Sequence, residues 1–132
     1  MRVLCFGYRT WAINIYNSIR EKVDSDIIIT DSRDLLNINV LESLNPSIVL
    51  FYGWSWFVPK SIIDKYSCFM LHPSSLPKYR GGSPIQNQIL DGLKITEICL
   101  FKMNDGVDEG PIYGRRDLDL SGEVSDIFQR ME

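Results

Sequence analysis

Short apolar runs alternate with amphipathic segments along this chain. The runs have the length of β-strands and cover residues 2–6, 26–30, 47–52, 68–71 and 95–102. After the first run, Trp11, Ile15 and Ile19 recur at helical spacing, and the leucines that follow the second run allow a short helix. Run 47–52 is apolar almost throughout, which is typical of a central strand in a parallel sheet. The alternation predicts an α/β fold with an open, mainly parallel, twisted sheet and helices on both faces.

Proline, glycine and capping residues mark the other predicted helices. Pro59 opens one of them at its first position. Another begins after Ser83, which stands three residues before Gln86 and so predicts a capping box, and Gly92 ends it. The buried face of this helix is expected to consist of Ile85, Ile89 and Leu90.

The C-terminal part continues with a glycine-bearing turn at 104–110 and a last extended element at 111–120. Residues 125–132 have the pattern of the first two turns of a helix. From this pattern and the length we expect one domain, residues 1–132, that is cut short at its C-terminal end.

Composition narrows the class of protein. Hydrophobic residues make up 45% of the chain and charged residues 23%, as in ordinary globular proteins and unlike disordered ones. The 14 Lys and Arg residues do not outnumber the 17 Asp and Glu residues, so no nucleic-acid partner is expected. No apolar stretch approaches the roughly 20 residues that span a bilayer, and no signal-peptide pattern is present. We therefore expect a cytoplasmic protein with no membrane partner.

The cysteines carry no sign of a metal or redox function. Cys5, Cys68 and Cys99 each lie in an apolar run and form no C-x-x-C pair, so buried free thiols are expected. His72 is the only histidine, and these four residues do not make a zinc-binding pattern. No metal site is predicted.

Polar and glycine-rich segments follow three of the expected strands, at 53–57, 72–82 and 105–110. Because the carboxyl ends of parallel strands lie at one edge of a sheet, we expect these segments to meet in one crevice. No G-x-G-x-x-G, G-x-x-x-x-G-K-[ST] or G-x-S-x-G motif is present. The sequence therefore does not predict a dinucleotide fold, a P-loop or a serine hydrolase.

Two interpretations are open for each candidate residue in these segments. His72 is either a structural histidine or, at the start of a loop rich in proline and glycine, a group with a chemical role. Asp108 either stabilises its glycine-flanked turn or contacts a ligand. The aromatic residues Trp54, Trp56 and Phe57 belong either to the core or to an apolar wall for a flat heterocycle.

Residues 71–92 and 103–110 together closely resemble the folate-dependent formyltransferase family, in the N-terminal catalytic domain of its members. The motif of that family is Asn-x-His, then S-L-L-P-x-x-x-G, then a G-x-D-x-G turn. Here Asp108 comes 36 residues after His72. The positions that match between them are Ser74, Leu76, Pro77 and Gly81. The amino-acid sequence most resembles the branch that formylates nucleotide-linked amino sugars, in residues 53–56, 80–89 and 108–114.

This resemblance implies a Rossmann-like fold and transfer of a formyl group from N10-formyltetrahydrofolate to an amine. It implies that His72 accepts the proton of the amine and helps to hold the oxyanion, while Asp108 orients the imidazole. The positions that would bind the cofactor are Ser55, Trp56, Phe57, Asp105, Gly106 and Val107. The expected acceptor is a nucleotide-linked amino sugar, and the alternative is methionyl-tRNA. The sequence leaves open whether the protein forms a homodimer.

One motif position departs from the family. Met70 stands two residues before His72, where the family has Asn. A thioether cannot donate a hydrogen bond to an oxyanion, and the loss of one such donor costs roughly 10²–10³ in rate. Asn87 and Asn104 are candidate replacements. A further hypothesis is therefore a catalytically impaired member of the family that binds folate or a nucleotide.

Overall fold

The computed structural model describes residues 1–132, and the chain divides into two compact units, Met1–Met70 and Leu71–Glu132. The elements of the first unit are β1 (Arg2–Phe6), α1 (Thr10–Lys22), β2 (Asp26–Thr30), a 3-10 helix (Arg33–Leu35), α2 (Ile38–Leu44), β3 (Ile48–Phe51) and α3 (Lys60–Lys65). Strand β4 (Ser67–His72) contains the boundary between the units. The second unit continues with α4 (Pro84–Leu90), β5 (Ile95–Lys102), β6 (Ile112–Asp119) and α5 (Val124–Met131).

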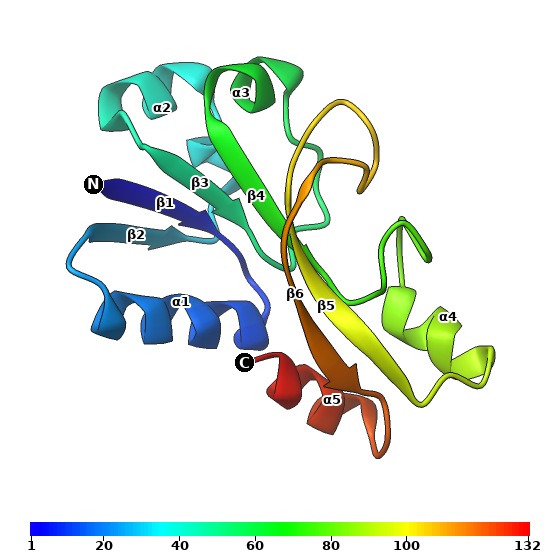
Figure 1. Ribbon diagram of the computed structural model, residues 1–132. Coiled ribbons are helices and arrows are strands. Elements are labelled where there is room, and N and C mark those ends of the chain that lie inside the picture. The colour runs from blue at the N-terminus through cyan, green and yellow to red at the C-terminus, as the bar shows by residue number, and fades with distance from the viewer. The chain divides into compact units, whose positions relative to one another are not determined.

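The strands form one six-stranded sheet in the order β2-β1-β3-β4-β5-β6. The pairs β1–β2, β1–β3 and β3–β4 are parallel, whereas β5–β6 is antiparallel. Within the first unit, α1 lies on one side of the strands and α2 and α3 lie on the other (Figure 1). The predicted α/β class, with a mainly parallel sheet and helices on both faces, is confirmed.

The predicted strands agree closely with those observed. The bounds of β1, β2 and β5 are those expected from the sequence. In β3, which is a central strand with a neighbour on each edge, Val49, Leu50 and Phe51 are all buried, because helices cover both faces of the sheet there (Figure 1). Pro59 differs slightly from its prediction, since it is the N-cap of α3 and the helix begins at Lys60.

Tyr16 of α1 is fully buried and joins the carboxyl ends of two strands. Its hydroxyl donates to the carbonyl of Phe6 at 2.7 Å and accepts from the N–H of Tyr52 at 2.8 Å. Gly7 permits this approach, since a Cβ there would lie 3.0 Å from Cε2 of Tyr16. The connections after β1 and β3 lead in opposite directions along the sheet. Their ends therefore form the switch point at which such sheets bind ligands.

Two predictions about α4 are wrong. Ser83 has a left-handed backbone, with φ at 53°, and its side chain makes no capping hydrogen bond. Ile85 is buried as expected, but Ile89 is 38% exposed and Leu90 is 83% exposed. Gln88 is fully buried in their place. The buried face of the helix thus consists of Ile85 and a polar side chain that bonds to its surroundings.

The capping box of this unit occurs at the start of α5. The side chain of Glu123 accepts from the N–H of Asp126, and the side chain of Asp126 accepts from the N–H of Glu123. Ile127 and Met131 are the buried residues of the helix, and α5 packs on β6. The expected two helical turns are therefore part of the folded second unit.

All three cysteines are buried and none forms a disulfide, as predicted. No helix has the length and apolar character needed to cross a membrane. No group of three or more His, Cys, Asp and Glu side chains is arranged to hold a metal ion.

Candidate functional site

His72 is the last residue of β4, and only 5% of it is exposed. Its Nδ1 atom lies 3.3 Å from Oδ2 of Asp108, and its Nε2 atom lies 2.6 Å from the carbonyl oxygen of Tyr79. The imidazole is therefore held between a carboxylate and a carbonyl group. Two motif residues that are far apart in sequence lie side by side within the second unit.

Both partners of this imidazole are hydrogen-bond acceptors. The Tyr79 contact is a hydrogen bond only when Nε2 carries hydrogen, because a carbonyl oxygen has none to donate. A neutral ring carries one hydrogen, and placing it on Nδ1 toward Asp108 leaves two lone pairs facing each other at Nε2. Before Nε2 can accept a proton from a substrate, the ring must separate from the Tyr79 carbonyl.

The Asp108 carboxylate is held by the loop that carries His72. Its Oδ2 atom accepts a hydrogen bond from the N–H of Gly81 at 2.8 Å. The turn that presents Asp108 closes tightly, since a Cβ on Gly110 would overlap the carbonyl oxygen of Lys102. This requirement for glycine explains the last residue of the G-x-D-x-G pattern in physical terms.

Side chains from three elements of the second unit anchor the loop that follows His72. They come from α4, β5 and β6, and each donates to a loop carbonyl group. The pairs are Gln88 to Pro73 at 2.8 Å, Cys99 to Ser74 at 3.1 Å, and Arg115 to Leu76 at 2.9 Å. Such bonds to buried carbonyls leave the loop little freedom to rearrange.

The anchored loop and its partner turn also contain unusual backbone. Four non-glycine residues of the chain have positive φ, and three of them are Tyr79, Ser83 and Asp108. Left-handed backbone costs energy for such residues and persists only where the surrounding contacts impose it. The strain is thus concentrated around His72.

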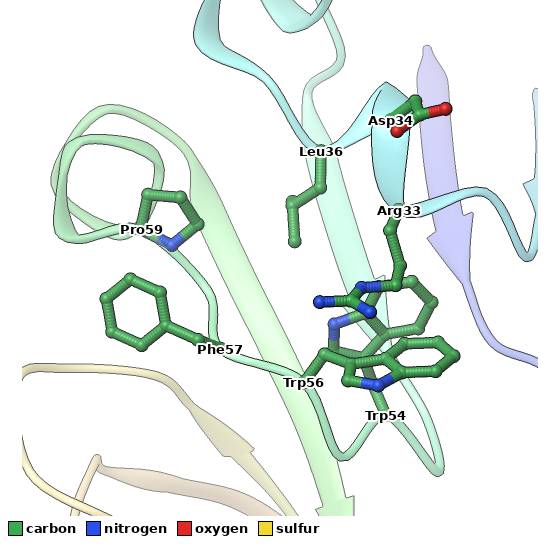
Figure 2. A pocket seen from close by; sticks show the side chains of 7 residues that line it. All are labelled: Arg33, Asp34, Leu36, Trp54, Trp56, Phe57 and Pro59. Atoms are coloured by element: carbon green, nitrogen blue, oxygen red, sulfur yellow. The ribbon is translucent and has the colours of Figure 1, made fainter.

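The first unit contains a pocket of about 410 Å³, which is within the range of small-molecule sites (Figure 2). It is lined by Arg33, Asp34, Leu36, Trp54, Trp56, Phe57 and Pro59. Trp54 is buried and also packs on Phe6, with the ring centroids 5.3 Å apart. Trp56 is 37% exposed and Phe57 is 82% exposed. The aromatic loop after β3 therefore contributes to the core and to a pocket wall.

The expected cofactor residues form two clusters, one in each unit. Trp56 and Phe57 line the pocket of the first unit, while the neighbouring Ser55 is exposed. In the second unit, Gly106 donates its N–H to the side chain of Asn104 at 2.9 Å, and Val107 is exposed. That the two clusters hold one ligand, together with Asp105, stays a prediction.

Sequence reasoning missed several residues around these sites. The carbonyl of Tyr79 was not anticipated, because backbone groups carry no sequence signal. Arg33 and Leu36 lie after β2, and the expected crevice was built only from the segments after the next three strands. The predicted strand that ends at Thr30 could have revealed them. Every parallel strand places its following segment at the same edge of the sheet, so the segment after Thr30 also belongs to the expected crevice.

Residues 8–126 match the family model described as "Formyl transferase". The chain belongs to the formyl transferase family. This match covers most of both units, including the loop of His72 and the turn of Asp108.

Individual members of the formyl transferase family show how far the likeness extends. The chain is 39% identical over 85 residues to the methionyl-tRNA formyltransferase of Rickettsia canadensis (strain McKiel), a match of 63% of this chain and 28% of that protein. Its structure resembles a methionyl-tRNA formyltransferase from Clostridium thermocellum with a TM-score of 0.92 and 34% identity, over 99% of this chain and 59% of the other. The chain thus spans less than a third of the length of the curated relative.

A third solved structure shares the fold. The formyltransferase PseJ from Anoxybacillus kamchatkensis was solved with UDP-4,6-dideoxy-4-formamido-L-AltNAc and tetrahydrofolate. It has a TM-score of 0.76 and 16% identity, over 99% of this chain and 68% of the other. The Rossmann-like fold expected from the sequence is therefore shared with solved formyltransferases.

Proposed function

We propose that this family member transfers a formyl group from N10-formyltetrahydrofolate to a primary amine. The observation that carries the proposal is the contact of 3.3 Å between His72 and Asp108 inside an anchored, largely buried loop. A paired histidine and carboxylate is the arrangement that general acid–base catalysis needs. Membership of the formyl transferase family and the likeness to the Clostridium thermocellum enzyme support it.

In the proposed reaction, the folate supplies a formyl carbon, which the amine nitrogen attacks. A carbon–nitrogen bond forms to the amine, and the bond between the formyl carbon and N10 breaks. His72 takes the proton that the amine loses and returns it to the leaving nitrogen, so that no net proton is released. Asp108 holds the ring through Nδ1 and stabilises its positive charge.

Each of the two segments expected to hold the pterin, taken by itself, carries groups that suit a pterin. A pterin presents N–H, nitrogen and carbonyl groups along the edge of a flat ring. Residues 55–57 and 105–107 lie outside helices and strands and are largely exposed. Their peptide groups are suited to bond such an edge, whereas those within strands are paired with each other.

For the acceptor amine, methionyl-tRNA has more support than the nucleotide-linked amino sugar expected from the sequence. The relatives from Rickettsia canadensis and Clostridium thermocellum, both over 30% identical, are named methionyl-tRNA formyltransferases. These relatives do not support the expected lack of a nucleic-acid partner. The amino sugar remains the second candidate for two reasons. The net charge of −3 does not favour binding of a tRNA, and the sequence of the loop after β3 resembles the sugar branch of the family.

Met70 favours an impaired catalyst. It lies two residues before His72 on β4, so the two side chains project to the same face of the strand. Asn87 donates to the carbonyl of Gly82 at 3.4 Å, and Asn104 accepts from Gly106. Unless a side-chain amide such as these reaches the oxyanion, the proposed reaction runs without one of its donors.

A transfer assay with labelled N10-formyltetrahydrofolate tests the proposal. We expect formylated product with methionyl-tRNA, and a loss of about 10²–10⁴-fold in His72→Ala. Product with a nucleotide-linked amino sugar alone would identify the second candidate as the acceptor. Binding of a 10-formyl folate analogue without transfer to either amine would favour the impaired member. No binding of the analogue would contradict the proposed function.

A further inference from the structure

Trp54 lines the pocket of the first unit and carries a hydrogen-bond donor that the protein does not use. The residue is 5% exposed, and its indole Nε1 atom is buried without an acceptor. Leaving such a donor unpaired costs about 1–3 kcal/mol, so native structures rarely keep one without a reason. A ligand that brings an acceptor into this pocket removes the cost.

Arg33 and Trp56 supply charge and a flat surface at the same pocket. The Arg33 guanidinium lies 4.8 Å from the centroid of the Trp56 ring. The ring of Trp56 also packs on those of Tyr8 and Trp54, at 4.5 Å and 4.9 Å between centroids. Figure 2 shows the Arg33 side chain reaching over the indoles, with Leu36 on the same side of the pocket. A flat ring placed here gains stacking area on a wall that is already rigid.

The charges of the pocket distinguish between ligands. The carboxylate of Asp34 lines it together with the guanidinium of Arg33, so the lining side chains carry no net charge. A bare anion therefore gains little, because the attraction of Arg33 is offset by the repulsion of Asp34. A flat heteroaromatic ring with an acceptor on its edge and an attached anion uses the aromatic wall, the unpaired donor and the guanidinium together.

We propose that this pocket binds the nucleobase and 5′-phosphate of the acceptor substrate. The base stacks on the indole ring of Trp56, an acceptor on its edge takes the indole N–H of Trp54, and Arg33 turns from the Trp56 ring to the phosphate, whereas the pterin assigned to residues 55–57 would use their peptide groups. The pocket lies where β2 and β3 end, beside the switch point of the sheet. The proposal rests on the proposed function, since both acceptors considered there carry a nucleotide.

Titration of the whole protein with AMP and UMP tests the proposal, because the two probes represent the end of a tRNA and a uridine-linked sugar. We expect one or both to shift the indole N–H resonance of Trp54, which Trp54→Phe assigns. Trp56→Ala should weaken binding about tenfold or more through lost stacking. Arg33→Gln should lower the affinity for the two nucleotides about fivefold and leave the affinity for adenosine and uridine unchanged. Arg116→Gln, an exposed arginine of β6, is the matched control and should bind as the unmodified protein does.

The relative affinities of the probes identify the source of the nucleotide. Tighter binding of AMP supports the end of a tRNA, and tighter binding of UMP supports a nucleotide-linked sugar. The proposal is overturned if neither probe moves the Trp54 resonance at about 10 mM, or if both probes bind Trp56→Ala unchanged. Equal competition by inorganic phosphate would also overturn it, since the pocket would then be a simple anion site.

A folate analogue separates this proposal from the proposed function. If the analogue moves the Trp54 resonance and displaces the nucleotides, the pocket belongs to folate and the nucleotide proposal falls while the proposed function stands. Nucleotide binding is measured without turnover. Failed formyl transfer with intact nucleotide binding would therefore contradict the proposed function alone.

Discussion

The Nε2 atom of His72 lies 2.6 Å from the carbonyl oxygen of Tyr79, whose backbone is left-handed with φ at 58°. This contact occupies the nitrogen that the proposed reaction uses as a base. We expect Nε2 to carry hydrogen in the ligand-free protein, because its contact with the carbonyl oxygen, at 2.6 Å, is shorter than the contact of 3.3 Å between Nδ1 and Asp108 and so is the costlier one to leave without a hydrogen. Nitrogen-15 NMR of the labelled ring measures this directly. The chemical shift of an unprotonated Nε2 would show that the contact is not a hydrogen bond in solution.

Asp108→Asn isolates the charge of the carboxylate from its shape. Asparagine tolerates the φ of 53° at this position, and its side-chain oxygen can still accept from the N–H of Gly81. We expect an unchanged melting temperature and a fall of about 10²–10⁴-fold in kcat for formyl transfer. Asp117→Asn, on an exposed position of β6, is the control and should retain activity. Parallel losses of stability and activity in Asp108→Asn would assign Asp108 a structural role.

Met70→Asn restores the amide that the family motif carries two residues before its histidine. If the missing donor limits the reaction, kcat should rise by roughly 10²-fold, with the KM for the folate little changed. Steady-state kinetics of the two proteins provide the comparison. An unaltered kcat would mean that another group, such as Asn87 or Asn104, already donates to the oxyanion.

Gln88→Leu tests the polar contacts that orient α4. The side chain is fully buried, donates to the carbonyl groups of Pro73 and Pro84, and accepts from the hydroxyl of Thr96. Leucine leaves these groups unpaired, so the free energy of unfolding should fall by about 3 kcal/mol in urea. Gln86→Leu on the exposed side of the same helix should change it by less than about 0.5 kcal/mol. Similar effects of the two substitutions would contradict this account.

Stability should decline in alkaline solution because of Cys5. Burial raises the pKa of its thiol from 9.0 to about 12, and the nearby Arg20 opposes this only in part. Between these pH values the unfolded chain binds fewer protons than the folded one. The contribution is therefore complete below pH 9.0 and is lost as pH rises toward 12, by up to about 1.4 kcal/mol per pH unit.

Urea unfolding at a series of pH values above and below 9.0 measures this slope. Cys5→Ala should unfold with a shallower dependence on pH than the unmodified chain. Part of the slope should remain, since burial also raises the pKa of Tyr16 well above its usual value. Val49→Ala, a truncation in β3 that removes no titratable group, should lower stability without altering the slope. Equal slopes for Cys5→Ala and the unmodified chain would exclude the thiol as a cause.

Local patterns predicted the elements well and the faces of one helix poorly. The strands were predictable because each apolar run must be buried, and burial of a short run favours a strand within a sheet. In α4, the apolar residues Ile89 and Leu90 are exposed while Gln88 is buried. The reason is that the loop carbonyl of Pro73 needs a donor, a requirement that depends on a distant segment.

The sequence by itself determined the α/β class, the bounds of most strands and the pairing of His72 with Asp108 through a family motif. The class and the strand bounds follow from periodicity along the chain, whereas the pairing was implied by the resemblance to the family motif. The tertiary structure alone decided which atoms meet: the Tyr79 carbonyl with Nε2 of His72, and the guanidinium of Arg33 with the Trp56 ring. Such contacts join segments that are separated in sequence. They depend on the order in which parallel strands lie in the sheet, and local residue preferences do not set that order.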